Sequence, residues 1–418
     1  MFASNADIPK AGVLIIGNEI ITGLVQDTNS ATICERLNMI GIDVARIISV
    51  GDDEASIKRA LSESLQAAEI VIVTGGLGAT HDDITKEVLA RFFNSEMAPD
   101  EKVRGMVEKF FKSRGREVPE YALSQCEAPQ KADILYNDIG TAPGLLFQQE
   151  GKMVFALPGI PVEMDYLLEQ QVLPRLASKS GVRIAHRALN TTGITESGLW
   201  EKVGPLDALK DSVVVASLPS HLGVRIRLSA YGKEESEAME KLNRAEKFFR
   251  EKISSYIYGL DEETLEGNLG QLLREKKLTL AVAESCTGGL IGHRLTNISG
   301  SSDYYLEGFV TYSNEAKARR LGVEMKLIEK HGAVSLDVAL AMAEGVRKAA
   351  GADRGLAVTG IAGPTGGTES KPVGLTFIAV SDKERSQCER FLFPQDRIRN
   401  KERAAQAALN LLRLSLIH

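Results

Sequence analysis

The sequence has few cysteines, no surplus of positive charge and no long apolar run. Its 4 cysteines are scattered without CxxC spacing, which argues against a disulfide framework and against a zinc site. The net charge of -6 lacks the basic excess that electrostatic binding of nucleic acid needs. No apolar stretch approaches the roughly 18 residues of a membrane span, and residues 1–10 lack the apolar core of a signal peptide. These absences favour a cytoplasmic protein without a membrane or nucleic-acid partner.

The composition is otherwise that of folded globular domains. Hydrophobic residues make up 44% of the chain and charged residues 25%, which is ordinary for such proteins. The 418 residues exceed the length of roughly 250–300 at which a single core stops growing. We therefore expect two or three domains.

Strand and helix patterns alternate over residues 11–90. Three apolar strand patterns and two segments of helical spacing follow one another in the order 13–17, 29–41, 42–50, 51–69 and 69–76. This order predicts a parallel sheet with helices on both faces. Ligands of such sheets bind beyond the carboxyl ends of the strands, where this chain has the loops GNEIITG (17–23) and TGGLGATHDD (74–83).

The second of these loops has the composition of a phosphate site. Its glycines would let the backbone approach a ligand, and Asp82 and Asp83 could hold a hard cation against a phosphate. A glycine turn before a helix with acidic first residues explains the same pattern equally well. Glu19 in the first loop is similarly ambiguous. The loop is not a dinucleotide-binding fingerprint, because GGLG differs from GxGxxG.

A small α+β unit is expected over residues 171–258, where three strand patterns precede one long charged helix at 234–253. No constellation of catalytic residues lies there. The basic and aromatic residues of its helix fit a core and a solvated face better than a nucleic-acid patch. Because the unit also has no GXXG loop to clamp a nucleic-acid backbone, we expect no RNA binding.

Residues 259–418 return to strand–helix alternation and contain AVAESCTGG (281–289). A strand ends there and a helix is expected to begin at once, which places Ser285 at the junction. Its hydroxyl could cap the helix, or it could attack a carbonyl whose oxygen faces free backbone amides. Cys286 is the rival nucleophile, although packing as a small buried thiol is the commoner role.

Three later segments favour a catalytic role for this junction. GFVTYSNEAKARRLGV presents Tyr312 and Lys317 at a second strand end. A lysine of depressed pKa can activate a serine, whereas a surface lysine is more often a solvated charge. The glycine- and threonine-rich loop after residues 356–359 suits a phosphate or a ribose. Arg397 and Arg399 begin the last helix, where cations oppose the helix dipole, and an anionic ligand would explain them.

Long motif strings at both ends of the chain resemble the CinA family. AESCTGGLIGHRLTNISGSSDYY, GFVTYSNEAKARRLGV, HGAVS and VTGIAGPTGGTESKPVG resemble its nicotinamide mononucleotide deamidase domain. GNEIITG, TGGLGATHDD, GTAPG (140–144) and LPGIPVEM (157–164) resemble its other domain, which is similar to the molybdopterin-binding fold. The resemblance implies an α/β chain with three domains. They are a molybdopterin-binding-like parallel-sheet domain at 1–170, a small KH-like α+β domain at 171–258 and a deamidase domain at 259–418.

The resemblance implies a bifunctional enzyme. The C-terminal domain would hydrolyse the carboxamide of nicotinamide mononucleotide to nicotinic acid mononucleotide and ammonia without a cofactor. The matched motifs make Ser285 the nucleophile, Lys317 its base and Tyr312 a supporting hydroxyl. The implied substrate contacts are Thr287, Gly288, Thr359, Gly360, Gly363 and Arg399. Arg399 is the least secure match, because Arg397 lies in the same turn.

The N-terminal domain would be an ADP-ribose pyrophosphatase that depends on a divalent metal. The implied contacts are Glu19, Thr74, Gly75, Gly76 and Gly78, with Asp82 and Asp83 as metal ligands. Relatives usually have a proline where this loop has Ala79. We expect the two nucleotides as partners and a homodimer, which no motif itself indicates. The alternatives are a non-enzymatic nucleotide- or molybdopterin-binding scaffold, and a protein in which only one domain is active.

Overall fold

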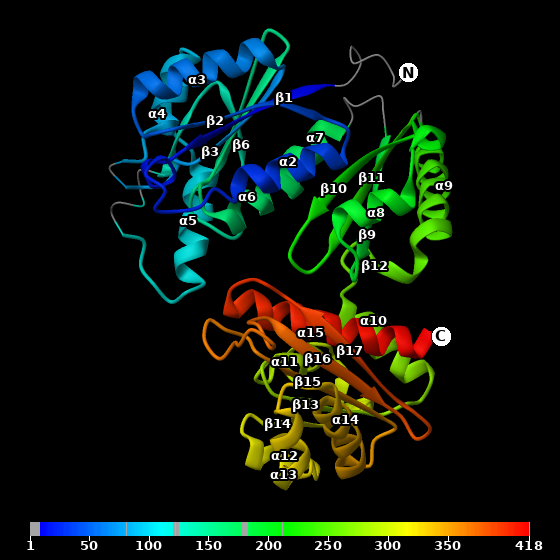
Figure 1. The fold of residues 1–418 in the computed structure, drawn as a ribbon. Coiled ribbons are helices and arrows are strands. Elements are labelled where there is room, and N and C mark those ends of the chain that lie inside the picture. Colours follow the sequence, from blue (N-terminus) through cyan, green and yellow to red (C-terminus); the bar gives the residue numbers. More distant parts are fainter. Residues whose placement is uncertain are drawn as a thin grey trace. The chain divides into compact units, whose positions relative to one another are not determined.

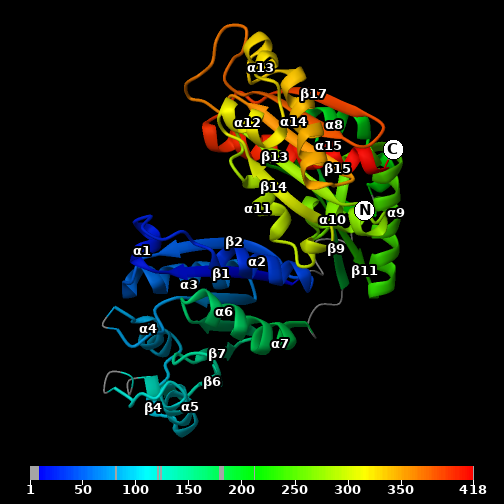
Figure 2. The same cartoon turned by 90° about the horizontal axis from the view of Figure 1, so that it is seen from below.

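The computed structural model describes residues 9–80, 82–119, 122, 125–177, 183–210 and 212–417. The chain forms two compact units, Met1–Ala185 with Ala230–Lys241, and His186–Ser229 with Leu242–His418. Figures 1 and 2 show the elements of the described residues, which include sheets of six, four and five strands and a two-stranded ladder. Among the described helices, none has both the length and the apolar character needed to cross a membrane.

The N-terminal sheet has the strand order β2-β1-β3-β8-β7-β6. Its strands are β1 (Lys10–Ile16), β2 (Asp43–Val50), β3 (Ile70–Thr74), β6 (Ala132–Leu135), β7 (Gly144–Gln149) and β8 (Lys152–Leu157). Strands β1, β2, β3 and β8 are parallel. Strand β7 pairs antiparallel with β8, and β6 pairs antiparallel with β7. The expected parallel-sheet domain is confirmed, with an antiparallel edge that the sequence had not indicated.

Helices cover both faces of this sheet, because successive strand residues point to opposite sides. Val13 and Ile15 of β1 belong to one core cluster, and Leu14 and Ile16 belong to the other. The first cluster includes residues of α2 (Asn29–Met39) and α6 (Pro161–Leu167), and the second includes residues of α3 (Glu54–Ala67) and α4 (Thr85–Phe92). The remaining elements are α1 (Asn18–Ile21), β4 (Met97–Pro99), α5 (Glu101–Lys112), β5 (Glu127–Pro129), the π-helical turn Leu168–Val172 and α7 (Leu173–Ala177).

The middle domain is the expected α+β unit. Its sheet has the order β10-β11-β9-β12. The strands are β9 (Arg183–Thr191), β10 (Val213–Pro219), β11 (Val224–Gly232) and β12 (Ile257–Leu260), and the helices are α8 (Glu196–Val203) and α9 (Glu235–Ile253). Strand β11 alternates between buried and more exposed residues, as a strand with one face on a core does.

The C-terminal sheet has the order β14-β13-β15-β16-β17. The strands are β13 (Leu280–Glu284), β14 (Tyr305–Val310), β15 (Arg354–Gly360), β16 (Leu375–Ser381) and β17 (Ser386–Leu392). The first three are parallel, and β16 and β17 are antiparallel. One core cluster includes residues of α10 (Leu265–Glu275), α11 (Leu290–Thr296) and α15 (Arg397–Ile417). The other includes residues of α12 (Asn314–Leu321), α13 (Met325–His331) and α14 (Leu336–Ala350).

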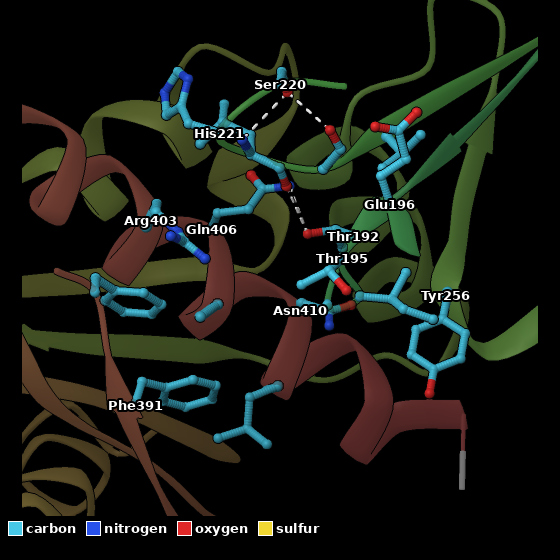
Figure 3. A pocket seen from close by; sticks show the side chains of 18 of the residues that line it. Thr192, Thr195, Glu196, Ser220, His221, Tyr256, Phe391, Arg403, Gln406 and Asn410 are labelled. Carbon is cyan, nitrogen blue, oxygen red and sulfur yellow. Dashed lines mark hydrogen bonds between the residues drawn. The ribbon is translucent and has the colours of Figure 1, made fainter. Parts of the chain in front are cut away.

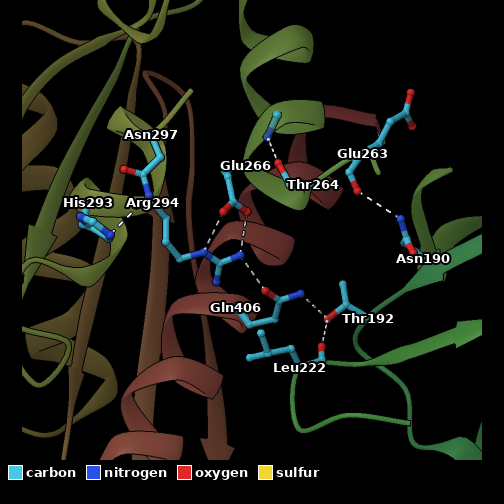
Figure 4. A network of polar contacts seen from close by, with 11 residues as sticks. Asn190, Thr192, Leu222, Glu263, Thr264, Glu266, His293, Arg294, Asn297 and Gln406 are labelled. Atoms are coloured by element: carbon cyan, nitrogen blue, oxygen red, sulfur yellow. Dashed lines mark hydrogen bonds and ion pairs between the residues drawn. The ribbon is translucent and has the colours of Figure 1, made fainter. Parts of the chain in front are cut away.

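Helix α15 also contacts the middle domain within the second unit. Arg294 donates to Glu266 and to Gln406 Oε1 (2.8 Å), and Gln406 Nε2 donates to Thr192 Oγ1 at 3.2 Å (Figure 4). Arg413, 3% exposed, donates to the backbone oxygens of Ser255 and Ile257. These contacts satisfy buried polar groups, which would otherwise cost free energy.

Candidate active site

Ser285 lies directly after β13 in a buried position. Its side chain is 8% exposed, and its backbone N–H donates to Val358 O of the neighbouring β15 at 3.0 Å. Because β13 and β15 are parallel neighbours, their carboxyl ends meet at one edge of the sheet. The hydroxyl faces a cavity of about 200 Å³, which is also lined by Cys286, Tyr312 and Lys317.

Lys317 brings an amine to the same cavity from α12. Its side chain is only 1% exposed, and its Nζ lies 3.1 Å from Ser285 Oγ. The same Nζ donates to the backbone oxygens of Thr311 (2.8 Å) and Tyr312 (3.3 Å). All three hydrogen-bond partners are neutral, and the charge of nearby Glu315 opposes the effect of burial only in part. Burial accordingly lowers the pKa of Lys317, as a general base requires.

Cys286 is a poor nucleophile in this environment. Its side chain is 7% exposed, and burial raises the pKa of its thiol to about 12. The thiol is therefore protonated near neutral pH, where it supplies no negative charge to hold a proton on Lys317. Of the two neighbouring candidates, only Ser285 has a hydrogen-bonded amine.

The turn after Ser285 differs from the expected helix start. Helix α11 begins at Leu290, and residues 285–289 form a turn in which Gly288 and Gly289 have φ of 64° and 97°. Glu284, 3% exposed, explains the delay. Its Oε2 accepts the N–H groups of Gly289 (3.0 Å) and Ile291 (3.1 Å), and its Oε1 accepts that of Gly292 (2.8 Å). The sequence had not singled out Glu284, although it is an acid next to a candidate nucleophile.

Two backbone amides of this turn point to no protein acceptor. Within the described residues, the N–H groups of Cys286 and Thr287 have no hydrogen-bond partner on another residue, whereas that of Gly288 donates to Ser285 O. The Thr287 side chain is fully buried and its hydroxyl also has no partner. Free amides beside a nucleophile are the groups that stabilise an oxyanion.

The arginines at the start of α15 differ in their surroundings. Arg397 lines the cavity, and its guanidinium donates to Gly363 O (2.7 Å) and to the hydroxyl of Tyr312 (3.1 Å). Arg399 is paired with Asp396 (3.5 Å), is 61% exposed and is not among the residues lining the cavity. The structure thus brings Arg397 to Ser285 and Lys317, and leaves Arg399 outside.

Only some of the other contacts predicted for this domain line the cavity. Thr359 and Gly360 line the cavity, and the Thr359 hydroxyl donates to Ala333 O at 2.8 Å. A Cβ on Gly360 would lie 2.7 Å from Thr376 Oγ1, so only glycine fits there. Lys401, which the sequence had not indicated, lies beside the turn, because a Cβ on Gly288 would be 3.7 Å from its Nζ.

The N-terminal loops form a second cavity, of about 560 Å³, at the carboxyl ends of β1 and β3. Its lining includes every contact expected in this domain: Glu19, Thr74, Gly75, Gly76, Gly78, Asp82 and Asp83. A Cβ on Gly75, at φ 106°, would lie 2.0 Å from Ile16 O, so the loop geometry requires glycine. Thr74 is buried and donates to Pro158 O at 2.7 Å.

Several acidic side chains gather at this cavity. Burial, followed by the charges of nearby acids, raises the pKa of Asp52; those acids are Glu19, Asp82 and Asp83. Asp83 Oδ2 accepts the N–H of Thr80 at 2.9 Å and also its hydroxyl, so this carboxylate holds its own loop. Among the described residues, no three His, Cys, Asp or Glu side chains come together as a ready metal site. Asp52 was not indicated by the sequence.

Comparisons with known proteins match all three domains. Residues 12–178 match the probable molybdopterin binding domain, 186–259 the damage-inducible protein CinA KH domain, and 262–416 the CinA C-terminal domain. The chain is 45% identical over 410 residues to a CinA-like protein of Salinibacter ruber, covering 97% of this chain and 99% of that one. It is 42% identical over 412 residues to a CinA-like protein of Chloroherpeton thalassium, covering 96% and 98%. The crystal structure of competence/damage inducible protein CihA from Agrobacterium tumefaciens is 38% identical and covers 37% of this chain and 94% of that one, with a TM-score of 0.36.

Fold and site together define a three-domain α/β protein that combines a molybdopterin-binding-like domain with a CinA-type C-terminal domain. The chain belongs to the CinA family.

Proposed function

We propose that the C-terminal domain hydrolyses the carboxamide of nicotinamide mononucleotide to nicotinic acid mononucleotide and ammonia. The observation that carries the proposal is the buried pair in which Lys317 Nζ lies 3.1 Å from Ser285 Oγ. A serine needs a proton acceptor to become a nucleophile, and a neutral lysine supplies one. Tyr312 is 61% exposed, and its hydroxyl has no hydrogen bond to either group; the hydroxyl accepts one from Arg397 at 3.1 Å.

The reaction would proceed in two balanced halves. Ser285 Oγ bonds to the carboxamide carbon while its proton moves to Lys317, and the amides of Cys286 and Thr287 receive the oxyanion. The C–N bond then breaks, and Lys317 returns the proton to the leaving ammonia. Water then attacks the resulting ester and gives one proton to Lys317. As the ester breaks, Lys317 returns a proton to Ser285 Oγ. The sum is amide plus water to acid plus ammonia.

The charges around the cavity support a phosphorylated substrate. Arg397 lies at the cavity, and Lys401 lies beside Gly288. Neither has a carboxylate partner among the described residues. Two cations near a small cavity suit an amide-bearing ring that carries a phosphate on its ribose.

The direct test is ammonia release from nicotinamide mononucleotide by the purified protein and by Ser285→Ala. We expect release by the wild type and a loss of several orders of magnitude in the variant. Binding of the nucleotide without ammonia release by the wild type would favour the non-enzymatic scaffold.

We propose a second activity for the N-terminal domain, hydrolysis of ADP-ribose with a divalent cation. The observation that favours it is the cavity that joins a glycine loop to several carboxylates, among them those of Glu19, Asp52, Asp82 and Asp83. A hard cation such as Mg²⁺ needs only one or two carboxylates when substrate phosphates and water complete its shell. When bound, the ion would neutralise the diphosphate. ADP-ribose cleavage that continues after chelation of divalent cations would contradict the proposal.

The remaining expectations from the sequence are proposals of the same kind. The proposed partners are nicotinamide mononucleotide and ADP-ribose, acted on by a cytoplasmic homodimer that recycles pyridine nucleotides. The middle domain is proposed to bind no nucleic acid.

A further inference from the structure

A cavity of about 660 Å³ lies between α15, β17 and the loops of the middle domain, within the second unit (Figure 3). It shares no lining residue with the cavity that contains Ser285 and Lys317. Its volume falls within the range of roughly 300–1,000 Å³ that small-molecule sites occupy. Neither proposed activity uses it.

One part of its wall is aromatic and aliphatic. The rings of Phe391 and Phe393 are stacked, with centroids 5.7 Å apart and planes at 16°, and Leu411 and Leu414 extend this surface. Such a surface favours a flat ring, which buries apolar area and can stack. Figure 3 shows Phe391 and Arg403 on one side of the view and Thr192, Thr195 and Asn410 nearer the other.

Two donors of α15 at this cavity have no acceptor. Arg403 is partly buried, and its guanidinium lies 4.9 Å from the centroid of Phe393, without a paired carboxylate among the described residues. Asn410 is 8% exposed; its Oδ1 accepts from Arg413 at 2.9 and 3.1 Å, whereas its Nδ2 has no partner in the described part of the chain. A guanidinium and an amide N–H at one cavity suit a carboxylate.

The acids of the lining limit the charge of the ligand. Glu196 and Glu389 also line the cavity, and His221 is paired with Glu402 at 2.7 Å. With one unpaired guanidinium and two carboxylates, the lining would repel a phosphate dianion more strongly than it would repel a ligand with a single carboxylate. Among anions, the lining therefore favours a ligand with one negative charge over one with two.

We propose that this cavity binds a small planar aromatic carboxylate, with its ring against Phe391 and its carboxylate on Arg403 and Asn410. The site is separate from the proposed deamidase chemistry, so it stands or falls independently of that function.

The test uses naphthoate and naphthamide, which share a shape and differ in charge, titrated into the full-length protein and followed by ligand-observed NMR. We expect naphthoate to bind at least tenfold more tightly than naphthamide. Arg403→Gln should weaken naphthoate roughly tenfold or more, because a hydrogen bond to a charged group is lost. Arg399→Gln is the matched control, since Arg399 lies on the same helix, exposed and paired with Asp396. Ser285→Ala should bind naphthoate like the wild type.

A charge-reversal variant guards against misfolding as an explanation. Arg403→Glu should lose naphthoate and gain affinity for naphthamidine, its cationic counterpart, and a gain of binding cannot come from an unfolded chain. Equal binding of naphthoate and naphthamide by the wild type, or unchanged naphthoate binding by Arg403→Gln, would overturn the proposal. So would loss of naphthoate binding in Ser285→Ala, because the ligand would then occupy the other cavity.

Discussion

Replacing Lys317 tests whether a buried neutral amine activates Ser285. Lys317→Met keeps the length of the side chain and removes the amine, and Lys317→Arg keeps a permanent positive charge that cannot accept a proton. General-base catalysis contributes roughly 10²- to 10⁴-fold to a rate. We expect both variants to lower kcat for deamidation by about that factor, with Lys317→Arg nearly as impaired as Lys317→Met.

The structure also gives the direction of the pH dependence. A lysine with the ordinary pKa of about 10.4 is neutral in roughly one molecule per thousand at pH 7.4. At 1% exposure, with three neutral hydrogen-bond acceptors, the pKa of Lys317 is lowered by burial. Each unit of lowering raises the neutral fraction about tenfold. The rate should therefore rise with pH up to this lowered pKa and level off above it.

The same shift affects stability with a definite sign. Between the lowered pKa of folded Lys317 and the unfolded value near 10.4, the unfolded chain binds more protons than the folded one. The free energy of unfolding therefore rises with pH in that window, by at most about 1.4 kcal/mol per pH unit. Lys317→Met lacks this contribution. We expect the difference in free energy of unfolding between the two proteins to move in favour of the wild type as pH rises towards 10.

Two measurements check this reasoning: ammonia release between about pH 6 and pH 10, and urea unfolding in the same buffers. The exposed Lys326, changed to Met, is the matched control and should alter neither. Turnover by Lys317→Arg above a tenth of the wild-type value would show that the residue acts as a fixed charge. A pH-independent stability difference between Lys317→Met and the wild type would show that the amine is not desolvated.

Three further predictions concern the rival nucleophile, the acidic loop and the domain boundary. Cys286→Ala should retain most deamidase turnover, because its thiol has a pKa of about 12 and is protonated at neutral pH; a loss as large as that of a serine variant would reverse the assignment. Asp82→Ala with Asp83→Ala should abolish metal-dependent ADP-ribose cleavage and leave ammonia release as an internal control; equal cleavage rates would mean that the acids only start a helix. A fragment of residues 255–418 should fold and deamidate alone. A shorter fragment of residues 262–418 should have a free energy of unfolding about 1–3 kcal/mol lower than the longer one, because buried Arg413 loses its acceptors at Ser255 and Ile257. Equal urea midpoints and slopes for the two fragments would contradict that reason.

Local patterns of the sequence were enough for most elements of the fold. The strand pattern at 279–285 corresponds to β13 (Leu280–Glu284), and α12 follows Ser313, whose hydroxyl accepts the N–H of Ala316 as an N-cap. Such signals are short-range, because apolar periodicity and capping depend on residues within one or two turns. They could not place the start of α11. The Glu284 carboxylate accepts hydrogen bonds from three backbone N–H groups, and a helix that began at Cys286 would place those groups differently.

The site itself depended on contacts between distant segments. The sequence supplied Ser285 and Lys317, 32 residues apart, but only the parallel pairing of β13 and β14 brings α12 close enough for a 3.1 Å contact in a buried position. It named Arg399 as the substrate contact, with Arg397 as the alternative in the same turn. Two positions on a helix differ by about 200° around its axis, so the docking of α15 decides which one reaches the cavity. That orientation is set by core packing along the whole of α15, which no local pattern encodes, and it places Arg397 at the cavity and Arg399 in solvent.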